Sequence, residues 1–149
     1  MRRLRVDEIA DSVQTYGGHA YHDCLDAARA ERVPILYPQA GAEWRTNDGI
    51  TLRFIGPSLP LIGGKNAIND NSIAFLLQYE QFRMLFTGDA GDAAEERFLD
   101  EGIDLSADVS IPNAMSSTPN RRINGARWKT SRTRVSFGSS TLRAPSLII

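Results

Sequence analysis

Residues 69–109, NDNSIAFLLQYEQFRMLFTGDAGDAAEERFLDEGIDLSADV, are the stretch of sequence that decides the fold. Two almost continuously apolar runs, 72–79 and 82–87, are separated only by Glu80-Gln81. Short apolar runs joined by two residues are typical of a β-hairpin, so we expect two paired strands here. Because strands of this composition are buried on both faces, we also expect other elements to cover them.

A helix and a further strand are expected after this hairpin. The helix is expected to begin at Ala90 or Asp92, because the acidic residues that follow favour the positive end of a helix dipole. It is expected to end near Glu101, before Gly102. Residues 107–111 then predict a short strand that returns to the sheet.

One more helix is expected near the N-terminus. Its predicted range is 19–32, between Gly17-Gly18 and the helix breaker Pro34. Residues 4–9 and 33–37 are predicted as short strands on either side of this helix. The apolar stripe expected on it consists of Ala20, Cys24, Leu25, Ala27 and Ala28.

A second hairpin is predicted between these two regions. Its turn is Asn47-Asp48-Gly49, which is followed by a strand over 50–55. Residues 57–71 are rich in Pro, Gly, Asn and Asp and are expected to form a loop. Strands that alternate with helices and hairpins predict an α/β layered domain with a mixed sheet and flanking helices.

Composition excludes several classes of protein. The chain has 149 residues, of which 42% are apolar and 23% charged, which suits one globular domain. A single cysteine, Cys24, and two histidines cannot form an internal disulfide or a Cys/His zinc module. No run approaches the roughly 18 apolar residues of a membrane span, and the N-terminus has no signal-peptide pattern, so a soluble cytoplasmic chain is expected.

The net charge of −1 hides two unlike parts of the chain. Residues 1–108 contain all 18 acidic and 10 of the basic residues, whereas residues 109–149 contain 7 basic and no acidic residues. The second part is also rich in Ser and Thr and shows neither helical nor strand periodicity. We therefore expect a folded domain over 1–111 and a weakly structured basic tail over 112–149.

Asp89 is the residue best placed for metal chemistry. It follows the strand predicted at 82–87, so its carboxylate is expected at the rim of the sheet, where its two oxygens can bridge two metal ions. The alternative is that Asp89 is the N-cap of the next helix, a common role of aspartate. The residue types alone favour the N-cap.

The order of these motifs resembles the metallo-β-lactamase family, and more narrowly the hydrolase domain of ComEC-type competence proteins. The resemblance implies the αββα fold of that family, of which this chain would supply the middle region. It also implies that Asp89 bridges two zinc ions whose shared hydroxide attacks an ester or phosphodiester bond. The matching residues are Asn69–Ser72, Leu85–Asp89, Ala94-Glu95 and Ala107-Asp108-Val109.

The other metal ligands of the family are missing from this sequence. Its His-x-His-x-Asp-His motif does not occur, and Asn113 and Ala114 occupy the places of a later histidine pair. His19 and His22 are close enough along a helix to hold a metal with Asp23 or Asp26, but their position past the family's metal motif favours ordinary surface residues.

We therefore expect a metallo-β-lactamase-like hydrolase fragment that is not catalytically competent alone. The abrupt change of composition at the tail resembles the product of a reading-frame slip or a recombined gene end. A second chain that completes the site, or self-association, is a further interpretation. The alternative function is a binding module whose tail contacts nucleic acid phosphates through Arg121, Arg122, Arg127, Lys129, Arg132 and Arg134.

Overall fold

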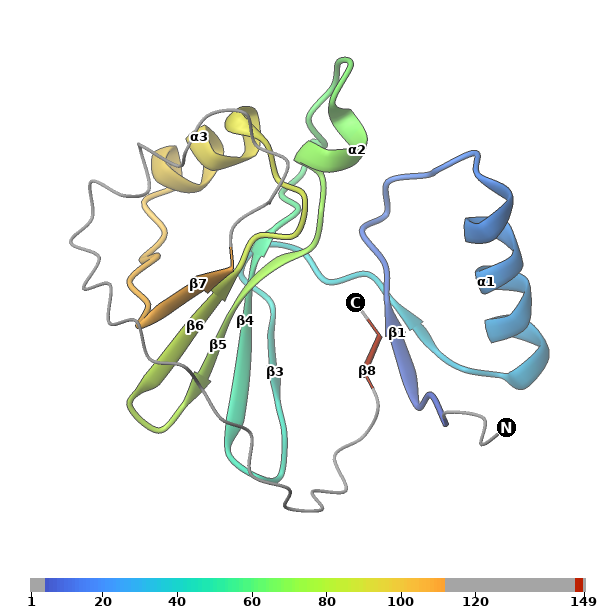
Figure 1. The fold of residues 1–149 in the computed structure, drawn as a ribbon, viewed down its shortest axis with the longest axis horizontal. Coiled ribbons are helices and arrows are strands. Elements are labelled where there is room, and N and C mark those ends of the chain that lie inside the picture. The colour runs from blue at the N-terminus through green and yellow to red at the C-terminus, as the bar shows by residue number, and fades with distance from the viewer. Residues whose placement is uncertain (1–4, 112–146, 149) are drawn as a thin grey trace.

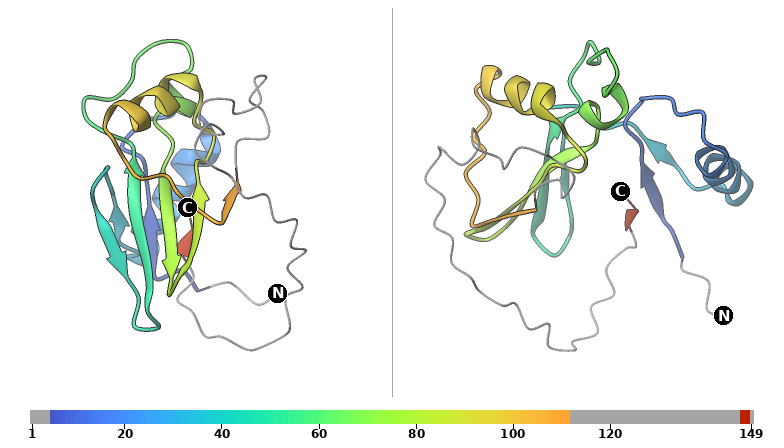
Figure 2. Two further views of the ribbon diagram at one scale, coloured as in Figure 1. Left: turned by 90° about the vertical axis from the view of Figure 1, so that its left-hand side faces the viewer. Right: turned by 45° about the horizontal axis from the view of Figure 1, so that its top comes forward.

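The computed structural model describes residues 5–111 and 147–148 and shows a mixed α/β fold. Two sheets lie between helix α1 (His19–Glu31) on one outer side and helix α3 (Asp92–Asp100) on the other (Figures 1 and 2). Within the described ranges, no helix is long and apolar enough to cross a membrane. The expected α/β class with a mixed sheet and flanking helices is confirmed.

The larger sheet contains five strands in the order β3-β4-β5-β6-β7. Neighbouring strands are antiparallel, except that β6 and β7 are parallel, so the sheet is mixed. The hairpins over 43–56 and 74–86 and the last strand confirm the predictions made for them. The bounds are β3 Glu43–Arg45, β4 Ile50–Gly56, β5 Ala74–Tyr79, β6 Phe82–Phe86 and β7 Val109–Ile111.

The turn of the first hairpin has the chemistry that its sequence predicts, whereas the second places a glutamate in the left-handed region. In the first, Gly49 has a φ of 85°, and the hydroxyl of Thr46 accepts a hydrogen bond from the Ile50 amide at 3.1 Å. In the second, Glu80 has a φ of 53°, and Tyr79 pairs directly with Phe82. These local features set the register of the sheet.

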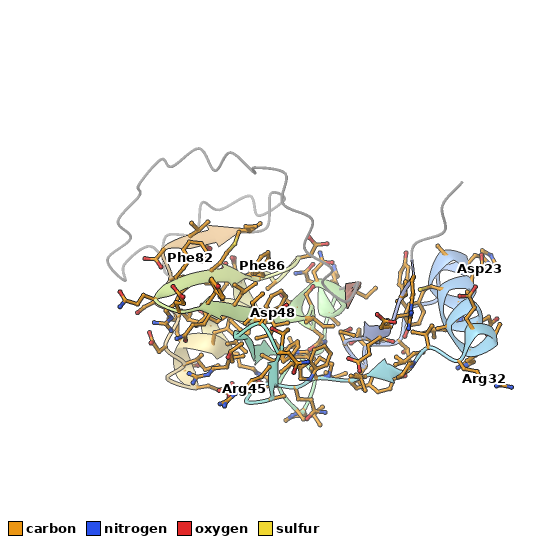
Figure 3. All side chains as sticks on the ribbon, turned by 90° about the horizontal axis from the view of Figure 1, so that it is seen from below. Asp23, Arg32, Arg45, Asp48, Phe82 and Phe86 are labelled. Carbon is orange, nitrogen blue, oxygen red and sulfur yellow. The ribbon has the colours of Figure 1, made fainter. Side chains whose placement is uncertain are left out.

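Both faces of this sheet are apolar, and α3 covers one of them. On that face Phe98 of α3 packs against Ile55 and Leu85 of the strands, and all three are at most 3% exposed. On the other face, aromatic rings from four strands follow one another, with centroids 4.7–5.9 Å apart. Figure 3 shows Phe82 and Phe86 along β6 on this face. The row consists of Trp44, Phe54, Phe75 and Phe86.

The smaller sheet is parallel and has the order β2-β1-β8, with β1 Glu8–Ala10, β2 Ile35–Leu36 and β8 Leu147–Ile148. The first two strands are shorter than the ranges 4–9 and 33–37 that the sequence predicted, and β1 is also shifted. Pro34 and Pro38 flank β2 and have no N–H to donate, so the ladder between these strands is only two pairs long. The tail over 112–149 was expected to be weakly structured, but its residues Leu147 and Ile148 form the strand β8.

The buried face of α1 matches the predicted stripe only at Leu25 and Ala28. Tyr21, Leu25 and Ala28 face the fold, while Ala20, Cys24 and Ala27 are exposed. Both sets have helical spacing, and the set with the larger side chains removes more apolar area from water. The loop predicted over 57–71 also contains a short helix, α2 (Ala67–Asp70).

Candidate functional site

Two loops meet at one end of the larger sheet. Because β5 and β6 are antiparallel, the residues before β5 and those after β6 lie at the same end (Figure 1). A Cβ on Gly88 would lie 3.0 Å from the Cβ of Ser72 and 3.1 Å from the carbonyl oxygen of Ile73. The Asn69–Ser72 and Leu85–Asp89 motifs are therefore in contact in the fold.

The Thr87-Gly88-Asp89 turn holds the Asp89 carboxylate at the rim of the sheet. Thr87 is buried, its hydroxyl donates to the carbonyl oxygen of Ile111 at 3.4 Å, and its own carbonyl accepts from the Ala90 amide at 3.1 Å. Gly88 has a φ of 57° and no room for a side chain, so glycine is required there on two grounds. Asp89 itself is exposed, in the place that the sequence predicted.

The interpretation of Asp89 as a helix N-cap is wrong. Helix α3 begins at Asp92. Its N-cap residue is Gly91, which has no side chain to cap the first turn. Instead, Oδ1 of Asp70 accepts from the Gly91 amide at 3.1 Å. A carboxylate from α2 thus stands at the positive end of α3, where a negative charge is stabilised.

Asp70 is a residue that the sequence reasoning missed. It is 8% exposed, and its Oδ1 also accepts from Nδ2 of Asn66 at 3.1 Å. A Cβ on Gly91 would lie 2.7 Å from this oxygen and 2.6 Å from the Asn66 nitrogen, so the loops pack without space between them. The signal that could have found Asp70 is its place between two asparagines inside the Asn69–Ser72 motif.

Asn71 holds the loop before β5 together and was also missed. It is 1% exposed, and its side chain accepts from the Ile62 amide at 2.9 Å. Its Nδ2 donates to the carbonyl oxygens of Ile62 at 2.8 Å and Ala67 at 2.7 Å, and to Oε1 of Gln14 at 3.0 Å. The last bond ties the loop to the segment that follows β1. The side chain therefore has a structural task.

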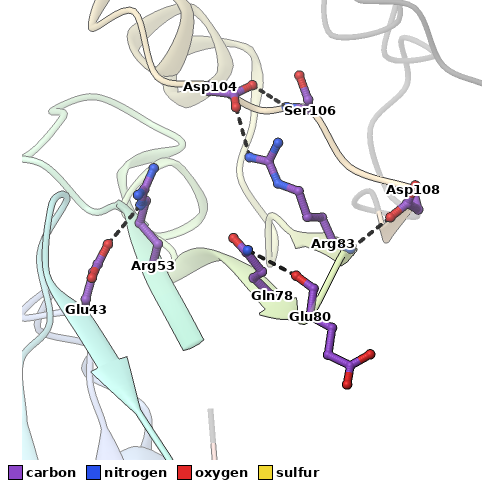
Figure 4. Close-up of polar contacts among 8 residues, drawn as sticks. All are labelled: Glu43, Arg53, Gln78, Glu80, Arg83, Asp104, Ser106 and Asp108. Atoms are coloured by element: carbon purple, nitrogen blue, oxygen red, sulfur yellow. Dashed lines mark hydrogen bonds and ion pairs between the residues drawn. The ribbon is translucent and has the colours of Figure 1, made fainter. Parts of the chain in front are cut away.

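Asp108 has a structural task as well, in the Ala-Asp-Val motif. Its Oδ2 accepts from the Arg83 amide, and its own amide donates to the Arg83 carbonyl, both at 2.9 Å (Figure 4). Arg83 also pairs with Asp104 at 3.0 Å. Hydrogen bonds from Ser106, followed by the Arg83 pair, lower the pKa of Asp104 to about 2. These contacts connect β6 to the chain that enters β7.

Glu95 adds a buried carboxyl to the first turns of α3. The side chain lies on the covered face of the helix, where the residue is 8% exposed. Burial, and then the neighbouring charge of Asp92, raise the pKa of Glu95. A carboxyl group whose pKa is raised in this way gives up its proton less readily and is a weaker metal ligand than an exposed carboxylate.

The described residues do not fit a dinuclear zinc centre. A zinc hydrolase needs several ligands around each ion, and no group of three or more His, Cys, Asp or Glu able to hold a metal exists within 5–111. His19 and His22 are exposed on α1, and Asp26 pairs with Arg29 at 2.9 Å. The positions Asn113 and Ala114 lie outside the described residues, as does the basic stretch from Arg121 to Arg134.

Comparisons with family models, with curated proteins and with solved structures found no match to this chain. What is shown is therefore the mixed α/β fold itself, with two loops in contact at one end of its larger sheet.

Proposed function

We propose that this chain is the middle portion of a metallo-β-lactamase-like metal-dependent hydrolase, and that it does not assemble a catalytic zinc centre from its own residues. The observation that carries the proposal is the contact between Ser72 and Gly88. It joins the Asn69–Ser72 motif to the turn that carries Asp89. The sequence resemblance rests on the same two motifs.

The layer order supports the same proposal. One helix lies outside each of two sheets, and this arrangement supports the αββα order that the resemblance implies (Figure 2). The smaller sheet contains strands of only two or three residues. A complete two-sheet domain needs a larger partner for the five-stranded sheet. The proposal of a partial fold therefore accounts for the difference in size between the two sheets.

The residues at the rim of the larger sheet support the proposal that the chain does not form a catalytically competent zinc centre. Asp89 is one exposed carboxylate, while Asp70 is buried and engaged with the Gly91 amide and Asn66. A hydrolytic zinc ion lowers the pKa of its bound water only when several protein ligands hold it in an open geometry. One carboxylate without histidine ligands does not meet this requirement.

The test is zinc binding together with phosphodiester hydrolysis by the purified full chain. We expect far less than one equivalent of zinc after dialysis, and no hydrolysis of bis(p-nitrophenyl) phosphate that depends on Asp89. Asp89→Asn is compared with Asp48→Asn, an exposed carboxylate in the β3–β4 turn. Stoichiometric, tightly held zinc with hydrolysis that is lost only in Asp89→Asn would refute the proposal of an incompetent centre.

A second candidate function is contact with nucleic acid through the basic tail. The observation that favours it is the sequence charge of residues 109–149, which hold 7 basic and no acidic residues. Phosphate contacts predict affinity for any nucleic acid that falls steeply with salt. Gel shifts at low salt test it with Arg121→Gln, Arg122→Gln, Arg132→Gln and Arg134→Gln combined. An unchanged affinity of this variant for nucleic acid would refute the proposed contact through the basic tail.

A further inference from the structure

A cavity of about 470 Å³ lies at the carboxyl ends of β1 and β2, beside α1. These strands are parallel, so the residues that follow them emerge at the same edge of the small sheet. In open α/β sheets this edge is where ligands bind. The size is also within the range of small-molecule sites.

The lining is apolar and aromatic, with two basic groups. Tyr21 and Leu25 come from the inner face of α1, and the ring of Tyr37 from the residue that follows β2. The ionisable groups other than tyrosine among the described lining residues are His22 and Arg29, and no carboxylate is among them. The lining thus combines aromatic and aliphatic side chains with the guanidinium of Arg29.

Two carboxylates form hydrogen bonds with lining residues, and donors of Arg29 remain available. Asp11 accepts the hydroxyl of Tyr21 at 2.7 Å, and this bond raises the pKa of Tyr21 to about 12, so the ring remains neutral. Asp26 accepts from one nitrogen of Arg29 at 2.9 Å. A guanidinium carries five N–H donors, so one ion pair does not exhaust it.

Val13 holds the edge of the cavity in a strained conformation. Its φ is 67°, in the left-handed region that a β-branched residue rarely adopts, and its side chain is partly exposed. Strain of this kind persists only where the surroundings impose it, and it gathers at binding sites. The strain is an observation independent of the charges on α1.

We propose that this cavity binds a small molecule in which an aromatic ring carries one anionic group, a phosphate or a carboxylate. The ring packs between Tyr21 and Tyr37, and the anionic group is held by Arg29. The site shares no residue with the Asp89 turn. The proposal of a ligand site in this cavity is therefore independent of the proposed relation to metal-dependent hydrolases.

The experiment is an NMR titration of the ¹⁵N-labelled full chain with phenyl phosphate and with benzoate. We expect saturable shifts of the amides of Val13, His22 and Tyr37 with at least one of the two, and the stronger binder identifies the anionic group. Benzyl alcohol and inorganic phosphate each lack half of the recognised chemistry. They are expected to bind at least about tenfold more weakly, because each forgoes either the charge-assisted hydrogen bonds or the ring contacts.

Matched variants separate the site from general charge effects. Arg29→Gln is expected to weaken binding of the anionic probe about tenfold, the scale of a lost charge-assisted hydrogen bond. Arg32→Gln makes the same charge change just beyond the end of α1, outside the cavity lining, and is expected to leave binding unchanged. Tyr37→Leu removes one ring and is expected to weaken both aromatic probes.

Three results would overturn the proposal. They are the absence of saturable shifts at the cavity with either anionic probe, equal losses in Arg29→Gln and Arg32→Gln, and binding of the stronger anionic probe that is no tighter than that of benzyl alcohol or inorganic phosphate. Arg29 and Tyr37 are exposed, so neither substitution is expected to unfold the chain. The dispersion of the same spectra verifies this point directly.

Discussion

Replacing Asn71 with alanine removes the side chain that organises the loop before β5. In the folded chain this amide satisfies both the N–H and the C=O of Ile62, at 2.9 and 2.8 Å. The Ala67 carbonyl keeps one partner after the substitution, because it also accepts from the Asn71 backbone amide at 3.0 Å. The groups that lose this partner are therefore the two backbone groups of Ile62 and Oε1 of the Gln14 side chain.

The expected cost follows mainly from the two backbone groups of Ile62. Leaving a buried polar group unsatisfied costs about 1–3 kcal/mol. Ile62 is only half-buried, so water recovers part of this loss, and we expect Asn71→Ala to lower the free energy of unfolding by about 2–3 kcal/mol. For a chain of this size, that corresponds to a fall in Tm of about 6–12 °C.

Urea unfolding followed by circular dichroism measures this difference. The matched control is Asn69→Ala in the neighbouring helix α2. The side chain of Asn69 makes one bond to another side chain, at 3.1 Å to Asn66. We expect that control to cost less than about 0.5 kcal/mol, as surface changes do. If Asn71→Ala and Asn69→Ala shift the urea midpoint equally, the assignment of a structural task to Asn71 is incorrect.

Three further predictions concern α3 and the turns beside it. Gly102 has a φ of 65° and open space around it, so Gly102→Ala should lower the free energy of unfolding by about 1 kcal/mol. Gly88→Ala also meets the neighbouring loop and should lower it by about 2–3 kcal/mol. Equal values by chemical denaturation would contradict the close packing at Gly88. Phe98→Ala should lower the free energy of unfolding by about 3–5 kcal/mol, and Leu99→Ala by less than about 1 kcal/mol because Leu99 is 42% exposed. Thermal unfolding tests this ranking, and a larger loss for Leu99→Ala would contradict it. Because the pKa of Asp104 is lowered to about 2, its carboxylate contributes stability that is present above its ordinary value of 3.8 and is lost as the pH falls toward 2. Asp104→Asn should flatten that part of the stability curve, and an unchanged acid limb would contradict the cause assigned to the shift.

The hairpins were predictable because their signals are local. The Asn47-Asp48-Gly49 turn and the two residues between the runs 72–79 and 82–87 each determine a chain reversal within a few residues. The helix beginning at His19 is local in the same sense. Its buried face was predicted only in part. Leu25 and Ala28 are covered as expected, whereas Tyr21 is covered in place of Ala20, Cys24 and Ala27, a choice that only the packed structure makes.

The candidate site was predictable only in part. The position of Asp89 at a strand end follows from sequence, since the preceding residues are a buried strand. The carboxylate that serves α3 is Asp70, which precedes that helix by 22 residues and belongs to another loop. A contact between two loops cannot be read from residue spacing, because it depends on how β5 and β6 bring their ends together.

By itself the sequence determined the α/β class, the two hairpins, the exposed place of Asp89 and the absence of a His-x-His-x-Asp-His motif. The tertiary structure decided which face of α1 is buried, and it assigned structural tasks to Asp70, Asn71 and Asp108. It also brought the ends of β1 and β2 together around a cavity. The physical reason is range. Turns and periodicity act within a few residues, whereas burial and polar partners come from segments that are distant in the chain and meet only when the sheets form.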